Sequence, residues 1–220
     1  MSDVVLFGIG DFAQVAREYL RDDSPHDVVA FTVHERYIEE PELRGLPVVP
    51  FERIEETHPP SAYAMFVAVG FSGVNRTRRE LYEECRRTGY ELITYVSSQA
   101  MRATSVEVGD NCFVFEANVL QPFVQIGSNV IVWSGNHIGH HVTIRDHCFI
   151  ASHAVISGNV TIGEETFVGV NATFRDGVTV GPRNVIGAGA LIMKDTEEGA
   201  VYSSRGADPR PAKSWDLKGF

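Results

Sequence analysis

The sequence of 220 residues predicts two parts, a small α/β domain over residues 1–98 and an all-β repeat domain with a C-terminal tail over residues 99–220. In the first part, short apolar runs alternate with amphipathic stretches, which is typical of an open α/β sheet. In the second part, an aliphatic or aromatic residue recurs at every sixth position from Val108 to Ile192. A fixed short period indicates units that stack on one another and bury a continuous core.

Composition excludes several classes of function. The chain is 44% hydrophobic and 22% charged, which is typical of a globular protein with a core. Its net charge of −10 argues against a nucleic-acid partner, because such partners require a basic surface. No apolar run is long enough to cross a membrane, and the first residues lack the pattern of a signal peptide. The three cysteines show no framework spacing, so we expect reduced thiols in a cytoplasmic protein.

The first part is expected to form a small, open, parallel sheet that is too short for a complete dinucleotide-binding fold. Strands are expected over residues 4–7, 26–31, 62–69 and 90–96, with a short extended piece at 46–51. Amphipathic helices are expected over residues 11–21, with Asp11 as the N-cap, and 75–88, which Gly89 ends.

Each six-residue unit of the second part is expected to supply one short strand and one corner. The aliphatic residue points inward, and the residue four positions later is small or β-branched, so that it fits beside it. Glycines that follow the aliphatic residue are expected to supply corner conformations with positive φ. Three units close one triangular coil, so this part holds about five coils.

The hexad pattern resembles that of the left-handed β-helix acyltransferases. Together with the small α/β domain, the chain is similar over nearly its whole length to bacterial nucleotide-sugar acetyltransferases of the bacillosamine and sialic-acid type. The resemblance implies a left-handed parallel β-helix and a homotrimer with active sites between neighbouring subunits. It also implies acetyl transfer from acetyl-CoA to an amino or hydroxyl group of a sugar.

Five of the eight histidines cluster in the second part. A metal site within one subunit is not expected, because His141, His147 and His153 are spaced by six and should point away from one another. A neutral imidazole is suited to act as a general base. The resemblance assigns this role to His140, which lies one coil below the Gly-Asn-Val-Thr-Ile-Gly segment that begins at Gly158. The alternative for His140 is a solvated corner residue.

The resemblance also assigns the backbone N–H of Gly158 to the oxyanion of the reacting thioester, although a simple coil corner is the alternative. The family commonly has an acidic residue after the catalytic histidine, where this chain has His141. Asn136 or a backbone carbonyl could therefore orient the imidazole. The roles of His137, His141, His147 and His153 are left open between packing, subunit contact and ligand contact. Cys148 is expected in the core rather than as a nucleophile.

Three basic residues of the C-terminal segment are expected to bind the phosphates of coenzyme A: Arg205, Arg210 and Lys213. The family has a Gly-x-Pro-Ala-Lys tail, and this chain has Pro-Ala-Lys after a longer, arginine-containing segment. The alternative is a solubilising tail.

The Gly8-Ile9-Gly10-Asp11-Phe12-Ala13 segment follows a predicted strand and begins a predicted helix, where backbone N–H groups favour a phosphate. In the related enzymes this loop holds the diphosphate of the sugar nucleotide. Further residues are expected to contact the substrate: Glu35 for the base or sugar, Gly70, and Arg76 for a phosphate, with a solvated helix face as the alternative for Arg76.

The resulting hypothesis is an acetyl-CoA-dependent transferase that acts on a nucleotide-linked amino sugar, without a metal, with His140 as base in a direct ternary complex. The alternatives are an O-acetyltransferase for a free sugar such as a sialic acid, and a β-helix binding protein without chemistry. A carbonic anhydrase of the β-helix type is disfavoured, because the long gap between its zinc-binding histidines is missing.

Overall fold

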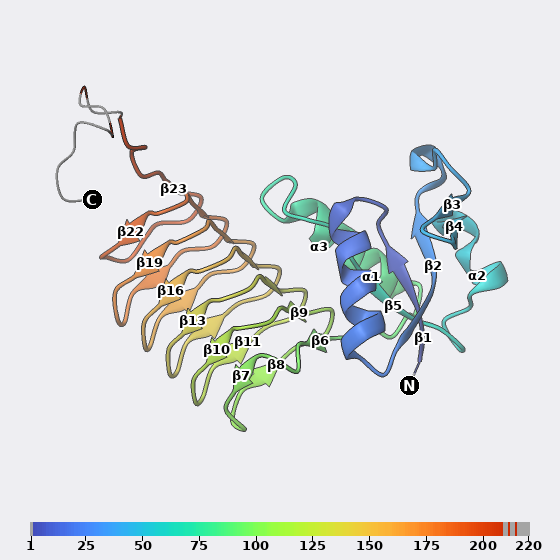
Figure 1. Cartoon of the computed structure of the whole chain (residues 1–220), viewed down its shortest axis with the longest axis horizontal. Helices are drawn as coiled ribbons and strands as arrows, with labels where there is room; N and C mark the ends of the chain where they lie inside the picture. The colour runs from blue at the N-terminus through green and yellow to red at the C-terminus, as the bar shows by residue number, and fades with distance from the viewer. Residues whose placement is uncertain (1, 209–210, 212–213, 215–220) are drawn as a thin grey trace.

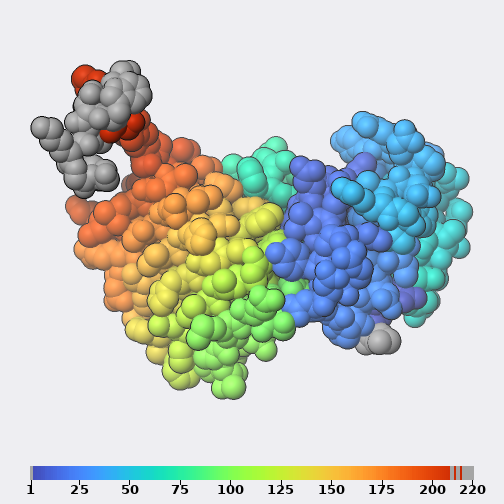
Figure 2. Space-filling model, viewed as in Figure 1, coloured from blue at the N-terminus to red at the C-terminus, as the bar shows by residue number. Residues whose placement is uncertain are grey.

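The computed structural model describes residues 2–208, 211 and 214. It contains an α/β part and a β-helix that lie next to each other along the long axis of the molecule, with the α/β part against one side of the β-helix (Figure 1). Figure 2 shows the two parts in contact over a broad area. Within the described residues, none of the helices has the length and apolar character needed to span a membrane.

The α/β part is an open sheet with the strand order β3-β4-β2-β1-β5. All neighbouring strands are parallel, as predicted, except the short antiparallel pair β3–β4. Its strands are β1 (Asp3–Phe7), β2 (Asp27–Val33), β3 (Glu42–Leu43), β4 (Leu46–Pro50) and β5 (Ala64–Val67). Its helices are α1 (Asp11–Asp23), η1 (Glu35–Tyr37), η2 (Phe51–Arg53), α2 (Ile54–Thr57) and α3 (Arg76–Arg87).

Two details differ from the sequence-based expectation. Gly10, in an extended conformation, is the N-cap of α1, so the prediction that Asp11 caps this helix was wrong. Asp11 is instead the first helical residue, where a negative charge is favourable to the helix dipole. Residues 90–96 do not form a last strand of the α/β sheet: Leu92 makes one bridge to Met65, and Tyr95–Val96 (β6) pairs with the β-helix. The division of the chain after residue 98 stays a prediction.

The β-helix consists of three parallel sheets of six, five and seven short strands, which form the faces of a prism. Residues eighteen apart pair in successive coils, as Leu120 pairs with Ile138 and Ile138 with Ile156. The strands are β6 (Tyr95–Val96), β7 (Met101–Arg102), β8 (Glu107–Val108), β9 (Phe113–Val114), β10 (Val119–Leu120), β11 (Gln125–Ile126), β12 (Ile131–Val132), β13 (His137–Ile138), β14 (Thr143–Ile144), β15 (Phe149–Ile150), β16 (Val155–Ile156), β17 (Thr161–Ile162), β18 (Phe167–Val168), β19 (Thr173–Phe174), β20 (Thr179–Val180), β21 (Val185–Ile186), β22 (Leu191–Ile192) and β23 (Val201–Tyr202).

The aliphatic column predicted from the period of six is the core of this prism. Ile138, Ile156 and Phe174 are completely buried in it, and small residues such as Ala154 and Ala172 lie beside them. No coil could bury these side chains by itself, so each coil depends on its neighbours for its apolar contacts.

The glycines of the β-helix have a different role from the one predicted. Those that follow the aliphatic residue do not have positive φ; they permit close approach of the next coil. A Cβ on Gly139 would lie 2.7 Å from the backbone nitrogen of Gly158, and one on Gly163 would lie 2.5 Å from that of Pro182.

The residues with positive φ at the corners are mostly asparagine and histidine, which tolerate this conformation better than most residues do. They recur every six positions and include Asn129, His141, His147, His153, Asn159 and Asn171. The regular spacing of three histidines is thus explained by corner geometry.

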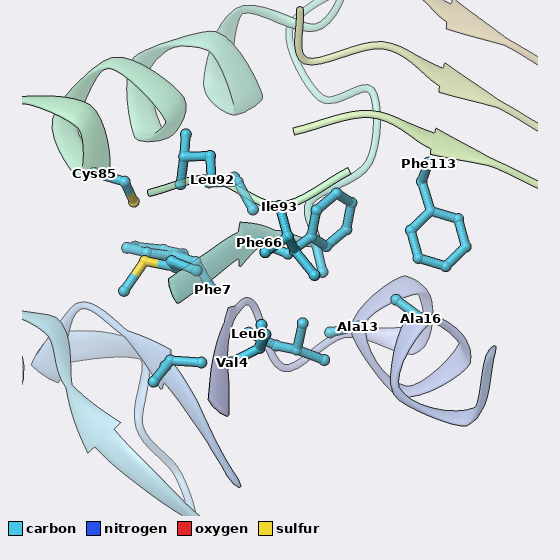
Figure 3. Close-up of a cluster of buried hydrophobic side chains, with 14 of the residues drawn as sticks. Val4, Leu6, Phe7, Ala13, Ala16, Phe66, Cys85, Leu92, Ile93 and Phe113 are labelled. Atoms are coloured by element: carbon cyan, nitrogen blue, oxygen red, sulfur yellow. The ribbon is translucent and has the colours of Figure 1, made fainter. Parts of the chain in front are cut away.

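An aromatic cluster joins the α/β part to the β-helix. The ring of Phe12 at the start of α1 packs against Phe113 and Trp133, with centroids 5.8 and 6.0 Å apart. Figure 3 shows the side chain of Phe113 directed towards the α/β core beside Ala16. Phe113 also lies 5.3 Å from Phe66 of the sheet. The two parts therefore share one hydrophobic core.

A buried arginine of α3 reinforces this contact. The guanidinium of Arg78 is completely buried, and it donates to the carbonyl oxygens of Gly70 (2.9 Å), His147 (2.8 Å) and Cys148 (3.0 Å) and to Asn75 Oδ1 (2.9 Å). Burial lowers the pKa of Arg78 to about 10, so the side chain remains charged at neutral pH. Arg78 is therefore closed off from solvent, and it binds the β-helix backbone.

We predict that Arg78→Leu lowers the free energy of unfolding by about 3 kcal/mol, because buried carbonyl groups lose their donors. Tm should fall by roughly 6–12 °C in a thermal melt. Arg76→Leu is the matched control, since Arg76 is exposed on the same helix and should change Tm by less than about 2 °C. Equal changes of Tm in Arg78→Leu and Arg76→Leu would contradict the stabilising role of the Arg78 hydrogen bonds.

A carboxylate at the end of α1 makes the contact between the two parts sensitive to acid. Asp23 accepts hydrogen bonds from Ser98 N–H, Tyr95 and Ser97, and those from Ser98 and Tyr95 contribute most to holding its pKa at about 2. Its stabilising contribution is therefore complete above about pH 4 and is lost as the pH falls towards 2.

We predict that Asp23→Asn lowers Tm by a few degrees at pH 7 and that the difference from wild type disappears near pH 2. Asp22→Asn is the control, because among the described residues the carboxylate of Asp22 bonds only to the exposed side chain of Arg21. Melts from pH 7 to 2 test this, and a difference that persists at pH 2 would show that the hydrogen-bonded charge is not the cause.

Candidate active site

One corner of the β-helix stacks His140, Gly158 and Asp176 in successive coils. The backbone N–H of Asn159 donates to His140 O, and that of Gly177 donates to Gly158 O, both at 2.9 Å. The eighteen-residue period thus places His140 directly below Gly158, as the sequence predicted. Asp176, which sequence analysis did not select, extends the same stack, and the period itself could have identified it.

The missing side chain of Gly158 makes room for this arrangement. A Cβ on Gly158 would lie 2.6 Å from Cε1 and 2.8 Å from Nε2 of His140, and 2.9 Å from Oδ1 of Asp176. Any larger residue would displace the imidazole or the carboxylate. The N–H of Gly158 makes no hydrogen bond to any residue that the structure describes. It can therefore serve as a donor to a ligand.

The opposite edge of the His140 ring contacts His141. The two Nδ1 atoms lie 3.2 Å apart, and the ring planes are nearly perpendicular. His141 has a φ of 58°, and its ring packs against Phe123 at 4.7 Å. The backbone N–H of His140 donates to Gln121 Oε1 at 2.9 Å. Because two imidazole Nδ1 atoms can share only one proton in a hydrogen bond, one ring is the donor and the other is the acceptor.

Asn136 is not the partner of His140. Its side chain is inside the coil, where it bonds to Asn118, to the carbonyl of Trp133 and to the N–H of Ala154. This corrects the expectation that Asn136 could orient the imidazole. The residue occupies a core position, since its amide satisfies backbone groups that are cut off from water.

The other clustered histidines lie apart from this stack. His137 is exposed on β13, and the ring of His153 lies against Gly135 at another corner. His147 faces α3, where its Nδ1 contacts Asn129 Nδ2 at 2.9 Å and its ring packs on Tyr82. Burial lowers the pKa of His147, so it is neutral at pH 7. Among the described residues, no group of three histidine, cysteine or acidic side chains could hold a metal ion.

Cys148 is completely buried, and its thiol lies 3.1 Å from the carbonyl of Gly163. Burial raises the pKa of the thiol to about 12. A thiol in this state is a poor nucleophile at neutral pH.

A cavity of about 860 Å³ opens at the carboxyl ends of β1, β2 and β5 in the α/β part. Five residues predicted to bind substrate line it: Gly8, Gly10, Asp11, Phe12 and Gly70. Gly8 has a φ of 131°, and a Cβ there would lie 2.6 Å from the carbonyl oxygen of Ala68. Only glycine lets the loop pass this close to the neighbouring strand end.

Glu35 and Arg76 do not line this cavity. Glu35 is exposed and contacts Arg53, and Arg76 is exposed and lies 3.9 Å from Glu80. The cavity instead contains His34, the first residue after β2, whose ring nitrogens contact Glu52 (3.1 Å) and Glu84 (3.3 Å). The residue that directly follows a parallel strand lies at this edge of the sheet, and this rule identifies His34. The sequence analysis selected the next residue, Glu35, instead.

Of the three basic residues predicted to bind coenzyme A, only Arg205 belongs to the described residues, and it is exposed. Arg210 and Lys213 lie outside the described residues.

The family model for the bacterial transferase hexapeptide (six repeats) matches residues 123–158 and 159–194. No curated protein sequence matches the chain.

The solved structures of several enzymes have the same fold over almost the whole chain. A histidine variant of perosamine N-acetyltransferase from Caulobacter crescentus, in complex with CoA and GDP-perosamine, has a TM-score of 0.82 and 26% identity, covering 91% of this chain and 93% of that one. The acetyltransferase domain of PglB from Neisseria gonorrhoeae FA1090 has a TM-score of 0.80 and 26% identity, with 96% and 100% covered. WeeI from Acinetobacter baumannii AYE shares the fold at 18% identity, a TM-score of 0.77, and 91% and 96% coverage.

The hexapeptide model and the extended structural matches agree with the unbroken period of six and with the three-sided stack of parallel strands. The chain therefore contains the bacterial transferase hexapeptide repeat over residues 123–194 and has the same β-helix fold as known sugar N-acetyltransferases.

Proposed function

We propose that this protein transfers an acetyl group from acetyl-CoA to the amino group of a nucleotide-linked amino sugar, with His140 as the general base. The observation that carries the proposal is the position of His140 Nε2 beside Gly158, whose N–H makes no hydrogen bond to any residue that the structure describes, in a chain with a cavity at the strand ends of its α/β part. The Caulobacter and Neisseria structures support it, because one holds CoA and GDP-perosamine and another holds acetyl-CoA.

The contact between His140 and His141 supports a specific protonation state. If His140 donates Nδ1–H to Nδ1 of His141, its Nε2 carries a lone pair that can accept a proton. Nε2 removes a proton from the amine as the amine nitrogen attacks the thioester carbon. The N–H of Gly158 donates to the developing oxyanion. The coenzyme A thiolate then leaves and takes the proton from Nε2, so no acyl-enzyme is needed. His141 thus acts as a positioning residue.

The cavity of the α/β part suits the nucleotide diphosphate. The loop from Gly8 to Gly10 leads into the N-terminus of α1, where backbone N–H groups and the helix dipole favour phosphate. We propose that Gly8, Gly10, Asp11, Phe12 and Gly70 contact the nucleotide and that His34 takes the place assigned to Glu35. The coenzyme A phosphates are assigned to Arg205, Arg210 and Lys213.

We further propose a cytoplasmic homotrimer. The outward face of the six-stranded sheet exposes aliphatic side chains, with Met101 at 71% and Leu191 at 63% of their full exposure and Val155 between them. This sheet leads through β13 to the corner that carries His140. Subunit contacts along it would cover the apolar side chains and form a groove at His140.

We predict that His140→Ala lowers kcat by about 10²–10⁴-fold and leaves the fold intact, because a positioned base contributes this much. The assay measures thiol release from acetyl-CoA with UDP-, GDP- and dTDP-linked 3-amino or 4-amino sugars, and with free sialic acid. Thermal melts with each nucleotide sugar report binding separately, since a ligand of the native state raises Tm.

An unchanged rate in His140→Ala would show that His140 is not the general base. Activity on free sugars alone would reject the nucleotide role of the α/β cavity and would favour an O-acetyltransferase.

We predict that His141→Gly, which keeps the positive φ without strain, lowers kcat about tenfold with little change in either KM. His141→Asp should retain activity, because a carboxylate also accepts from His140 Nδ1–H. It should also move the acid limb of the kcat/KM profile to higher pH, because a nearby negative charge favours imidazolium. Asn171→Gly is the control, at another corner with a φ of 58°. Full activity in His141→Gly would exclude the positioning role.

A further inference from the structure

The carboxylate of Asp176 lies across Gly158 from the imidazole of His140. Its Oδ1 and His140 Nε2 are 2.9 and 2.8 Å from the point that a Cβ on Gly158 would occupy. Nevertheless, they do not form a direct ion pair. A carboxylate and the basic nitrogen therefore face one small space on the surface of the β-helix.

Asp176 differs from Asp146 and Asp195, two other aspartates of the β-helix, whose side chains bond to the backbone of a neighbouring coil. Asp146 accepts from the N–H of Ser128, and Asp195 accepts from that of Thr179, both at 2.8 Å. Asp176 is exposed and accepts no hydrogen bond from any residue that the structure describes. Asp146 and Asp195 therefore stabilise the coil, whereas the carboxylate of Asp176 is available to a ligand.

The charged groups around this space leave the carboxylate without a counter-ion. Arg175 precedes Asp176, and Lys194 lies one coil further on at the same corner, eighteen residues later. Neither of these side chains forms an ion pair with Asp176 in the part of the chain that the structure describes. The nearest titratable partner across Gly158 is His140.

The spacing of these two acceptors suits a nitrogen with several protons. A tetrahedral nitrogen that donates two hydrogen bonds of ordinary length holds its acceptors roughly 4.6 Å apart. Asp176 Oδ1 and His140 Nε2 can have this separation, because both lie within 3 Å of the place of a Cβ on Gly158 and do not contact each other. A hydroxyl group has one proton, so it can donate to only one of the two acceptors. A carboxylate that is left unpaired beside a hydroxyl loses hydration without compensation.

We propose that Asp176 binds the ammonium group of the acceptor sugar and makes the site selective for amines over hydroxyl groups. This inference rests on the proposed function, and it specifies an amine rather than a hydroxyl group as the nucleophile. Asp176 is a binding residue, and it does not take the proton.

The ammonium group gives up two of its three protons in this reaction. The ammonium group donates to Asp176 Oδ1 and loses one proton to solvent, which leaves a neutral amine between Oδ1 and His140 Nε2. The amine nitrogen forms the bond to the thioester carbon, and its second proton moves to Nε2. The bond between carbon and sulfur breaks, and the thiolate takes that proton to give coenzyme A and the amide. Asp176 stabilises the positive charge on nitrogen before and during attack.

The test compares wild type with Asp176→Asn on two ligands. One is the nucleotide amino sugar that wild type turns over best, and the other is the same nucleotide sugar with a hydroxyl in place of the amine. We expect KM and Kd for the amine to rise by about 10–100-fold in Asp176→Asn, the loss expected for one charged hydrogen bond. We expect Kd for the hydroxyl analogue to change by less than about twofold. Titration calorimetry gives Kd without turnover.

Asp146→Asn is the matched control, because it removes the same charge at the equivalent position of another hexad. It should leave the preference for the amine unchanged. Equal weakening of both ligands in Asp176→Asn, or weakening of neither, would overturn the inference while the proposed function stands. A wild-type enzyme that acetylates only hydroxyl groups would overturn both.

Discussion

Every coil of the β-helix is hydrogen-bonded to residues eighteen positions further along the chain, and the rest of the structure depends on this register. It stacks the inward aliphatic residues into one column and leaves no room for a side chain where successive coils approach most closely. It also requires a positive φ at each corner, which asparagine, histidine and glycine supply. A shift of one residue would turn the apolar column towards solvent.

The same register makes one outer face of the prism a support for the α/β part. Aromatic residues of successive coils, including Phe113 and Phe149, face outward and pack against α1 and the loop before α3. Arg78 then satisfies carbonyl oxygens at the coil corners beside them. A charged group is tolerated at full burial because its donors have acceptors from both parts. The cavity of the α/β part is thereby held at a defined position relative to the β-helix.

The chemistry of the proposed site also derives from stacking. Residues at equivalent positions of three coils bring an imidazole, the N–H of a glycine and a carboxylate close together, although they are far apart in sequence. Backbone hydrogen bonds between the coils hold these groups on a rigid element. Such preorganisation reduces the cost of orienting the acceptor and the thioester.

The sequence by itself determined the period, the buried column, the parallel α/β sheet and the pairing of His140 with Gly158, because all of these follow from local patterns and one repeat length. It offered Asn136 as a partner of the His140 imidazole, which the structure contradicts, and it placed Glu35 and Arg76 at a cavity that they do not line. It missed Asp176, His34 and the burial of Arg78. Only the tertiary structure decided these points. The direction of a side chain at a corner or a strand end depends on which residues of other coils or strands surround it, and no local pattern contains that information.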